Sequence, residues 1–292
     1  MCELDQLNEM GPRAGKVSRR QFGTLGAVAG LGAAFAPWAT ACAQGAGGLT
    51  ENDVTFDAPG GTMDGFFVHP AEGKHPAVIL WPDIAGLRDA KKVMARRLAS
   101  SGYSVLVPNP FYRSAPAPQF EDFEDFRSQG GFQKVGPWMQ QNTPAALTET
   151  ATAVVVWLDQ QGSVDTARGI GNQGYCMSGS WTIRTAAAVP DRVKAGASFH
   201  GGGLVGDAPD SPEKLLAQTQ ASYLIAIAKN DDAQQPTHKD LFKAAAEAAG
   251  RPAEIEVYQG DHGWTVPDSP VYNQAEADRA WERLLNLYKT NL

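Results

Sequence analysis

The stretch GNQGYCMSGSWTIRTAAA, residues 171–188, places one cysteine between a strand-like run and a helix-like run. Small residues stand two positions before and two positions after Cys176, at Gly174 and Ser178. This spacing is typical of a nucleophile elbow, a strand-to-helix turn so sharp that larger side chains would collide. The start of a helix also favours an anion at that point. The alternative interpretation is a cysteine that only packs beneath the start of a helix.

Strand-like and helix-like segments alternate on both sides of this turn. Apolar runs predict strands at 63–70, 76–82, 103–110, 167–175, 193–202, 221–231 and 253–260. Helical spacing predicts helices at 88–102, 143–162, 180–189, 236–249 and 273–291. The alternation indicates an α/β fold, with a mainly parallel central sheet and helices on both faces. In such folds, ligands bind and react at the carboxyl ends of the strands.

One segment, 114–143, interrupts the alternation. It is long, aromatic and acidic and has no clear strand character. A loop of that length inside a compact domain is usually a lid or a binding element. The alternative is a pair of surface helices that covers part of the apolar sheet, and the sequence leaves both open.

The first 43 residues predict an export leader. Arg19 and Arg20 precede a Gly/Ala-rich apolar run at 23–36 and the small residues ATA at 39–41, a pattern that resembles a twin-arginine signal. The apolar run is too short and too rich in glycine for a membrane span of about 20 residues. We therefore expect an exported, periplasmic protein with a single domain over 50–292 and no membrane span in the mature chain. A lipid anchor on Cys42 is the minor alternative.

Composition narrows the function further. The 292 residues carry a net charge of -7, which disfavours nucleic acid or an anionic membrane as the partner. Of the three cysteines, Cys2 and Cys42 fall in the leader or at its edge, so Cys176 is the one that the mature body keeps. A solitary thiol is either a small buried apolar group or a working nucleophile.

A carboxylate and an imidazole follow at later strand ends. Asp231 and Asp232 stand at the end of one predicted strand, in the stretch KNDDAQQP where we expect a loop, and His262 comes after the next strand. Hydrolases of this architecture carry nucleophile, acid and base in that chain order. His200, in SFHGGG, also stands at a strand end, but it precedes both aspartates. We therefore interpret His200 as structural or pocket-lining.

With these residues in view, the chain from about Phe56 to its C-terminus resembles the dienelactone hydrolase family of α/β hydrolases. The resemblance rests on GYCMSG, on the acid and histidine loops, and on the stretches WPDIAGLRD (81–89) and VPNPFYR (107–113). It implies an α/β-hydrolase fold and an enzyme that cleaves a lactone or a small carboxylic ester through an acyl-thioester intermediate. It implies no metal and no organic cofactor, and a small ester or lactone as the partner.

The resemblance also implies a role for each site residue. Cys176 is the nucleophile and His262 the base. Asp231 orients the base, with Asp232 as the alternative acid. The backbone N–H groups of Ile84 and Met177 form the oxyanion hole, and Asp83 is a carboxylate near the resting thiol. Arg113 binds an anionic group of the substrate. Tyr112 and Trp264 make auxiliary contacts with the substrate.

Three positions depart from the family pattern. Ser178 replaces a glycine, Asp83 replaces a glutamate, and Val266 stands where the best-known members carry a second arginine. Together with the acidic insert, they favour a bulkier or less charged substrate than a dienelactone. The competing functions are a thioesterase or general carboxylesterase that acts on an unrelated acyl substrate, and a non-catalytic binding protein of the same fold.

Overall fold

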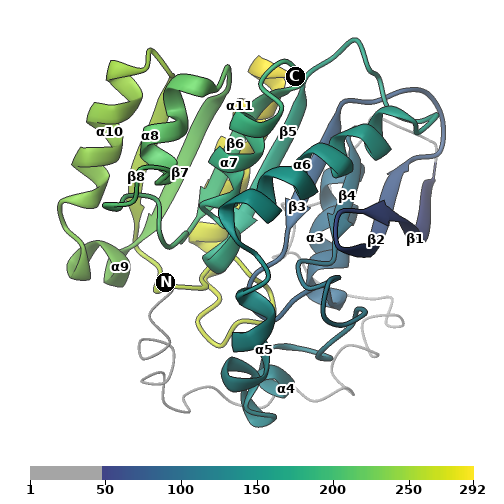
Figure 1. The fold of residues 1–292 in the computed structure, drawn as a ribbon, viewed down its shortest axis with the longest axis horizontal. Helices are drawn as coiled ribbons and strands as arrows, with labels where there is room; N and C mark the ends of the chain where they lie inside the picture. Colours follow the sequence, from purple (N-terminus) through teal and green to yellow (C-terminus); the bar gives the residue numbers. More distant parts are fainter. Residues whose placement is uncertain (1–47) are drawn as a thin grey trace, which may run out of the picture. The chain divides into compact units, whose positions relative to one another are not determined.

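An eight-stranded sheet runs through residues 48–292, the part of the chain that the computed structural model describes (Figure 1). The strand order is β1-β2-β4-β3-β5-β6-β7-β8; β2 is antiparallel to both of its neighbours and all other pairs are parallel. The expected α/β class with a mainly parallel sheet is therefore confirmed. The predicted leader, 1–43, and Cys42 lie outside the described residues. The strands are β1 (Leu49–Ala58), β2 (Gly61–Pro70), β3 (Ala77–Trp81), β4 (Ser104–Pro108), β5 (Ile170–Tyr175), β6 (Val193–Phe199), β7 (Ser222–Ala228) and β8 (Ala253–Tyr258).

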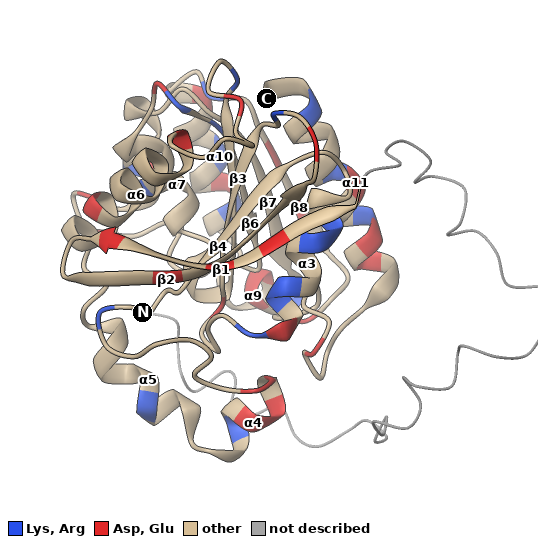
Figure 2. Ribbon diagram, turned by 90° about the vertical axis from the view of Figure 1, so that its right-hand side faces the viewer, with Lys and Arg blue, Asp and Glu red and all other residues tan. Residues whose placement is uncertain are grey.

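Helices cover both faces of the sheet (Figures 1 and 2). One face carries α6 (Pro144–Asp159), α7 (Trp181–Ala188) and α10 (His238–Ala248), and the other carries α3 (Asp89–Ala99) and α11 (Gln274–Asn291). Every residue of β3, β4 and β5 is buried as a result, which explains the apolar sequence of β3 and the mostly apolar sequence of β4. In β5 the amides of Asn172 and Gln173 are buried as well, and each donates a hydrogen bond. Across residues 48–292, no helix combines the length and the apolar character needed to cross a bilayer.

The edge strand β1 and the segment that carries the two aspartates differ from the sequence-based expectation. The edge strand β1 was not predicted, because half of its residues are exposed and its sequence, LTENDVTFDA, has no apolar run. The predicted strand over 221–231 is too long, and the loop expected at the aspartates is wrong: the strand ends at Ala228 and a short helix, α9 (Lys229–Gln234), begins at once. Carboxylates in the first turn of a helix are favoured by the helix dipole, so Asp231 and Asp232 suit this position.

The insert forms two short helices, α4 (Phe123–Ser128) and α5 (Gly131–Met139). They lie beyond one end of the sheet, the end that also carries α9, and not over a face (Figure 1). The insert therefore contains two helices, but they do not cover the sheet as the helix-pair interpretation expected, and the lid or binding element stays a prediction. The insert has an aromatic core of its own, in which the buried Phe126 ring packs edge-on at 5.0 Å from the ring of Phe120 and 4.7 Å from that of Phe132.

The turn after β5 is held by a serine hydroxyl. Ser178 Oγ accepts the backbone N–H of Tyr175 at 2.9 Å and donates to the carbonyl of Trp81, at the end of β3, also at 2.9 Å. The turn is so tight that a Cβ on Gly174 would lie 2.1 Å from the carbonyl oxygen of Ser178. The turn therefore requires glycine at 174, and the hydroxyl of Ser178 adds two hydrogen bonds where the family pattern has a glycine.

This close approach yields a stability prediction. Gly174→Ala forces a methyl group into the Ser178 backbone, and we expect it to lower the free energy of unfolding by about 3 kcal/mol, at the upper end of ordinary overpacking. The matched control is Gly162→Ala in the exposed turn after α6, where a Cβ meets nothing within 4 Å. That change should leave stability unchanged or raise it by up to about 1 kcal/mol, because alanine restricts the unfolded chain more than glycine does. Urea unfolding of both variants measures the difference; equal stability would contradict the geometry of the turn.

Candidate active site

Cys176 stands in a backbone conformation that side chains rarely adopt. Its φ is 54°, in the left-handed region, and its side chain is buried, with 4% of the residue exposed. Its carbonyl oxygen accepts the N–H of Gly179 at 3.1 Å and that of Gly202 at 3.2 Å, so both the turn and the segment after β6 fix this backbone. Such strain costs about 1–3 kcal/mol and is concentrated at functional sites.

An imidazole–carboxylate pair lies at the same edge of the sheet. His262, in the loop after β8, places Nδ1 2.8 Å from Oδ2 of Asp231 in α9. The backbone N–H of His262 donates to Asn230 Oδ1 at 2.8 Å, which ties the histidine loop directly to the start of α9. A carboxylate on Nδ1 holds an imidazole in one orientation and leaves Nε2 as the nitrogen that can exchange a proton with a substrate.

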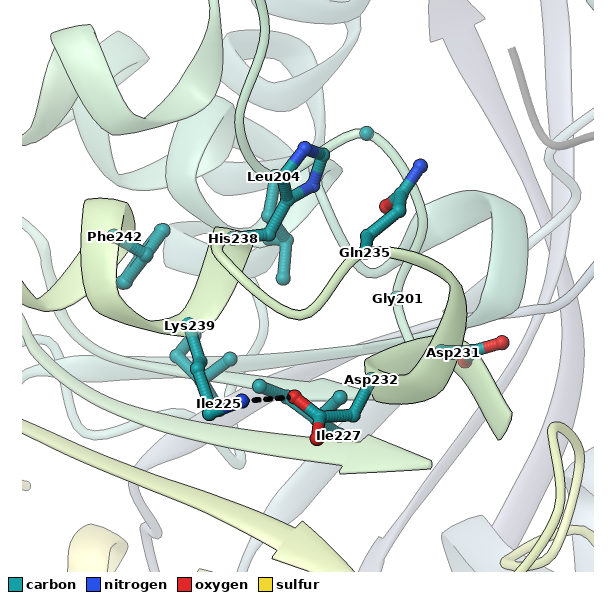
Figure 3. Close-up of a pocket in the computed structure, with 11 residues that line it drawn as sticks. Gly201, Leu204, Ile225, Ile227, Asp231, Asp232, Gln235, His238, Lys239 and Phe242 are labelled. Carbon is teal, nitrogen blue, oxygen red and sulfur yellow. Dashed lines mark hydrogen bonds and ion pairs between the residues drawn. The ribbon is translucent and has the colours of Figure 1, made fainter. Parts of the chain in front are cut away.

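The adjacent carboxylate has a different partner. Asp232 Oδ1 lies 2.6 Å from Lys239 Nζ of α10, and Asp231 points away from this pair (Figure 3). Asp231 and Asp232 both line a small pocket that has apolar and polar residues around it. Its lining includes Leu204, Ile225, Ile227, Gln235, His238 and Phe242. Of the two candidate acids, Asp231 is therefore the one that the structure brings to His262.

His200 lies directly beside the histidine loop. It is 1% exposed, its φ is 41°, and its ring centre is 4.9 Å from that of His262. Its Nε2 lies 3.0 Å from the hydroxyl of Thr265. Burial, the neighbouring His262 and Lys91 hold the pKa of His200 well below its usual value, so the ring is neutral. This buried, hydrogen-bonded position agrees with the structural interpretation of His200.

Asp83 is enclosed by cations. Its carboxylate lies 2.7 Å from Arg88 Nη1 and 2.7 Å from Lys91 Nζ, and it accepts the N–H of Ala85 at 3.0 Å. Burial opposes ionisation, but the two cations outweigh it and hold the pKa of Asp83 well below its usual range. Asp83 is therefore a permanent anion, and it fixes the loop that carries Ile84.

The other predicted binding residues have contacts elsewhere. Arg113 donates to Thr150 Oγ1 at 2.9 Å and to the carbonyl of Ala146 at 3.2 Å, both in α6. Tyr112 donates to the carbonyl of Pro59 at 2.6 Å. Trp264 is fully buried and stacks on Tyr258, with ring centres 4.7 Å apart. These side chains support α6, the β1–β2 turn and the histidine loop, and none of these contacts reaches Cys176, Asp231 or His262.

Four residues that organise the site were not identified from sequence. Ser178 was interpreted as a small residue only, although its hydroxyl joins the turn to β3. Asn230 precedes the two aspartates and offered a weak local signal. Arg88 and Asp268 contact each other across 180 residues, so no local pattern could pair them. Within residues 48–292, no three His, Cys, Asp or Glu side chains are grouped so that they could hold a metal ion.

Solved structures with this fold are numerous. A dienelactone hydrolase from Klebsiella pneumoniae, provisionally named as such, has a TM-score of 0.70 at 23% identity and covers 83% of this chain and 99% of its own. A dienelactone hydrolase-like promiscuous phosphotriesterase from metagenomic libraries has a TM-score of 0.67 at 21% identity, covering 84% of this chain and 99% of its own. The architecture is therefore the α/β-hydrolase fold.

The sequence comparisons identify the family. A Methylorubrum extorquens protein, provisionally named carboxymethylenebutenolidase, is 28% identical over 281 residues, which are 94% of this chain and 93% of that protein. An Escherichia coli K12 protein with the same provisional name is 26% identical over 243 residues, 81% of this chain and 85% of its own. The profile of the Dienelactone hydrolase family matches residues 63–292. The chain therefore belongs to the dienelactone hydrolase family and is a hydrolase of the ester and lactone class.

Proposed function

We propose that this protein hydrolyses a lactone or a small carboxylic ester with Cys176 as nucleophile, His262 as base and Asp231 as the residue that orients the base. The observation that carries the proposal is the 2.8 Å contact between His262 and Asp231, at the edge of the sheet where β5 ends in the strained turn of Cys176. The same three residue types occur there in the chain order that α/β hydrolases use.

In the first half of the reaction, His262 takes the thiol proton and the sulfur of Cys176 attacks the substrate carbonyl carbon. The backbone N–H groups of Ile84 and Met177 stabilise the negative charge on the carbonyl oxygen. The carbon–oxygen bond of the ester then breaks, and His262 returns the proton to the departing alkoxide. An acyl-thioester on Cys176 and a free or tethered alcohol are the products of this half.

In the second half, His262 removes a proton from water, and the resulting hydroxide attacks the thioester carbonyl. The carbon–sulfur bond breaks, the carboxylic acid is released, and the sulfur regains its proton. Asp231 accepts a hydrogen bond from Nδ1 throughout, so that imidazole and imidazolium keep the same orientation.

The substrate is an ester whose acyl part carries no obligatory negative charge. The position four residues after His262 is the buried Val266, and Arg113 is bound to α6. A clamp for a substrate carboxylate would need two arginines. Here one of the two positions is Val266, and the other arginine, Arg113, is hydrogen-bonded to α6. The relatives named for carboxymethylenebutenolidase activity support the lactone class in general, and a thioesterase or general carboxylesterase is the alternative within the same chemistry.

Substitution of the nucleophile tests the proposal directly. Cys176→Ala and Cys176→Ser should each lose on the order of 10³-fold or more of kcat, because the covalent intermediate cannot form at the normal rate. A panel of lactones, aryl esters and thioesters measures the loss and ranks the substrate classes. In a background with Cys2→Ser and Cys42→Ser, stoichiometric alkylation by iodoacetamide near neutral pH should disappear on the further change Cys176→Ala. A protein with Cys176 intact that neither turns over the panel nor reacts with the reagent would instead favour a binding protein.

The two aspartates provide a matched pair. Asp231→Asn should lower kcat by about 10²- to 10⁴-fold, because an amide no longer stabilises the imidazolium and favours the wrong tautomer. Asp232→Asn removes an equal charge one residue away, but it breaks a contact with Lys239 and should change kcat by less than about threefold. Steady-state kinetics on the best ester of the panel measures both. A larger loss in Asp232→Asn would assign the acid to Asp232.

We propose in addition that residues 1–43 export the folded protein to the periplasm. The support is the sequence pattern around Arg19 and Arg20. The double substitution Arg19→Lys and Arg20→Lys should reduce the periplasmic fraction at least about tenfold, as measured by cell fractionation and immunoblotting. Unchanged export would contradict a twin-arginine signal. Recovery of the wild type in the membrane fraction, lost in Cys42→Ser, would indicate the lipid anchor.

A further inference from the structure

We propose that Arg88 and Asp268 are positioning residues that hold the loop of His262 at a fixed separation from the loop of Ile84. The inference rests on the proposed function, since it assigns the base to the first loop and an oxyanion donor to the second. Neither residue was among the candidates from sequence, and both lie outside the proposed triad.

The guanidinium of Arg88 is fully buried, and each of its N–H groups donates a hydrogen bond. Its side chain is 0% exposed. Nε and Nη2 donate to the two oxygens of Asp268 at 2.6 and 2.8 Å, and Nη1 and Nη2 donate to those of Asp83 at 2.7 and 3.2 Å. The second hydrogen of Nη1 is directed to the carbonyl of Gly86 at 3.2 Å. All five N–H donors of the side chain therefore have an acceptor, which leaves the planar group one orientation.

The two carboxylates belong to the two loops that must be aligned. Asp83 immediately precedes Ile84, and its carboxylate also accepts the N–H of Ala85 at 3.0 Å, so the guanidinium is connected to the backbone that presents the oxyanion donor. Asp268 lies six residues after His262 in the same loop. One planar group thus connects the loop that carries the proposed base with the loop that carries one of the proposed oxyanion donors.

The insert, residues 114–143, contacts the carboxylate of Asp268 as well. Oδ2 of Asp268 accepts the backbone N–H of Phe123, the first residue of α4, at 3.1 Å. The Phe123 ring centre lies 6.0 Å from Cζ of Arg88. Asp268 therefore joins three segments that are far apart in the sequence: the loop before α3, the histidine loop and the insert.

A buried ionic bridge is a poor source of stability, because removing charges from water costs about as much as their attraction returns. An apolar side chain at 88 could fill the same space, but it would not set the direction or the separation of two loops. The bridge has a balanced composition, with Arg88 and Lys91 against Asp83 and Asp268. We infer that its role is geometric: it fixes the reacting groups relative to one another.

The experiment compares Arg88→Met, Arg88→Lys and Asp268→Asn with the wild type on the best ester of the panel. A displacement of the base by about 1 Å costs up to about 10²-fold in rate. We expect kcat to fall 10- to 100-fold in Arg88→Met with KM within about threefold. Arg88→Lys should recover part of the loss, because an ammonium still pairs with one carboxylate but cannot span two. Asp268→Asn, which keeps the shape of the side chain, should lose at least about fivefold.

A second bidentate pair serves as the control. Arg192 contacts Asp159 through Nε at 3.0 Å and Nη2 at 2.7 Å, at the junction of α6 and β6. Arg192→Met removes a bidentate arginine–carboxylate bridge that is more exposed than that of Arg88 and touches neither loop, so kcat should stay within twofold. Thermal unfolding of every variant ensures that the assays are made on folded protein, and Asp268→Asn provides the test if Arg88→Met does not fold.

The outcomes separate the two proposals. Suppose that Cys176→Ala is inactive while Arg88→Met keeps kcat within twofold of the wild type. The bridge is then structural only, and the proposed function stands. Asp268→Asn takes the place of Arg88→Met in this comparison if Arg88→Met does not fold. An equal fall in kcat in Arg192→Met would also overturn the inference, since the effect would not depend on the two loops. If Cys176→Ala keeps its activity, the proposed function falls and the inference falls with it.

Discussion

The contact between the Ser178 hydroxyl, the Tyr175 amide and the Trp81 carbonyl holds the turn on which Cys176 stands. It joins the end of β5 to the end of β3 at the point where the chain leaves the sheet for α7. Cys176 has a left-handed backbone within this turn. Gly202, after β6, binds the carbonyl of the same residue, so three neighbouring strands share in holding one thiol-bearing position.

Charge around this edge is arranged in close pairs. His262 has Asp231, Lys239 has Asp232, and Arg88 with Lys91 encloses Asp83. Pairing of this kind limits the cost of placing ionised groups at low exposure. It also separates the two adjacent aspartates by function, since one faces the imidazole and the other faces α10. A neutral His200 then lies beside His262 without adding a second positive charge.

The central strands, the helices on both faces and the turn at Cys176 were predictable because each has a local pattern: an apolar run, helical spacing or small residues around a nucleophile. The edge strand β1 was not, since half of it faces solvent. The acid was left as Asp231 or Asp232, because spacing alone does not say toward which element a side chain points. The Arg88–Asp268 contact joins residues that only the folded chain brings together. Arg113 shows the opposite case, in which a family resemblance predicts a ligand contact and the fold directs the side chain to α6.

The left-handed backbone at Cys176 also bears on how descendants of such a chain can change. Glycine tolerates that conformation without strain, whereas cysteine carries a cost of about 1–3 kcal/mol. A lineage in which hydrolysis is no longer selected therefore loses little by exchanging the thiol for a hydrogen atom. Relatives of this chain that have lost the hydrolase activity should therefore often carry glycine at position 176 while they keep Gly174 and Ser178.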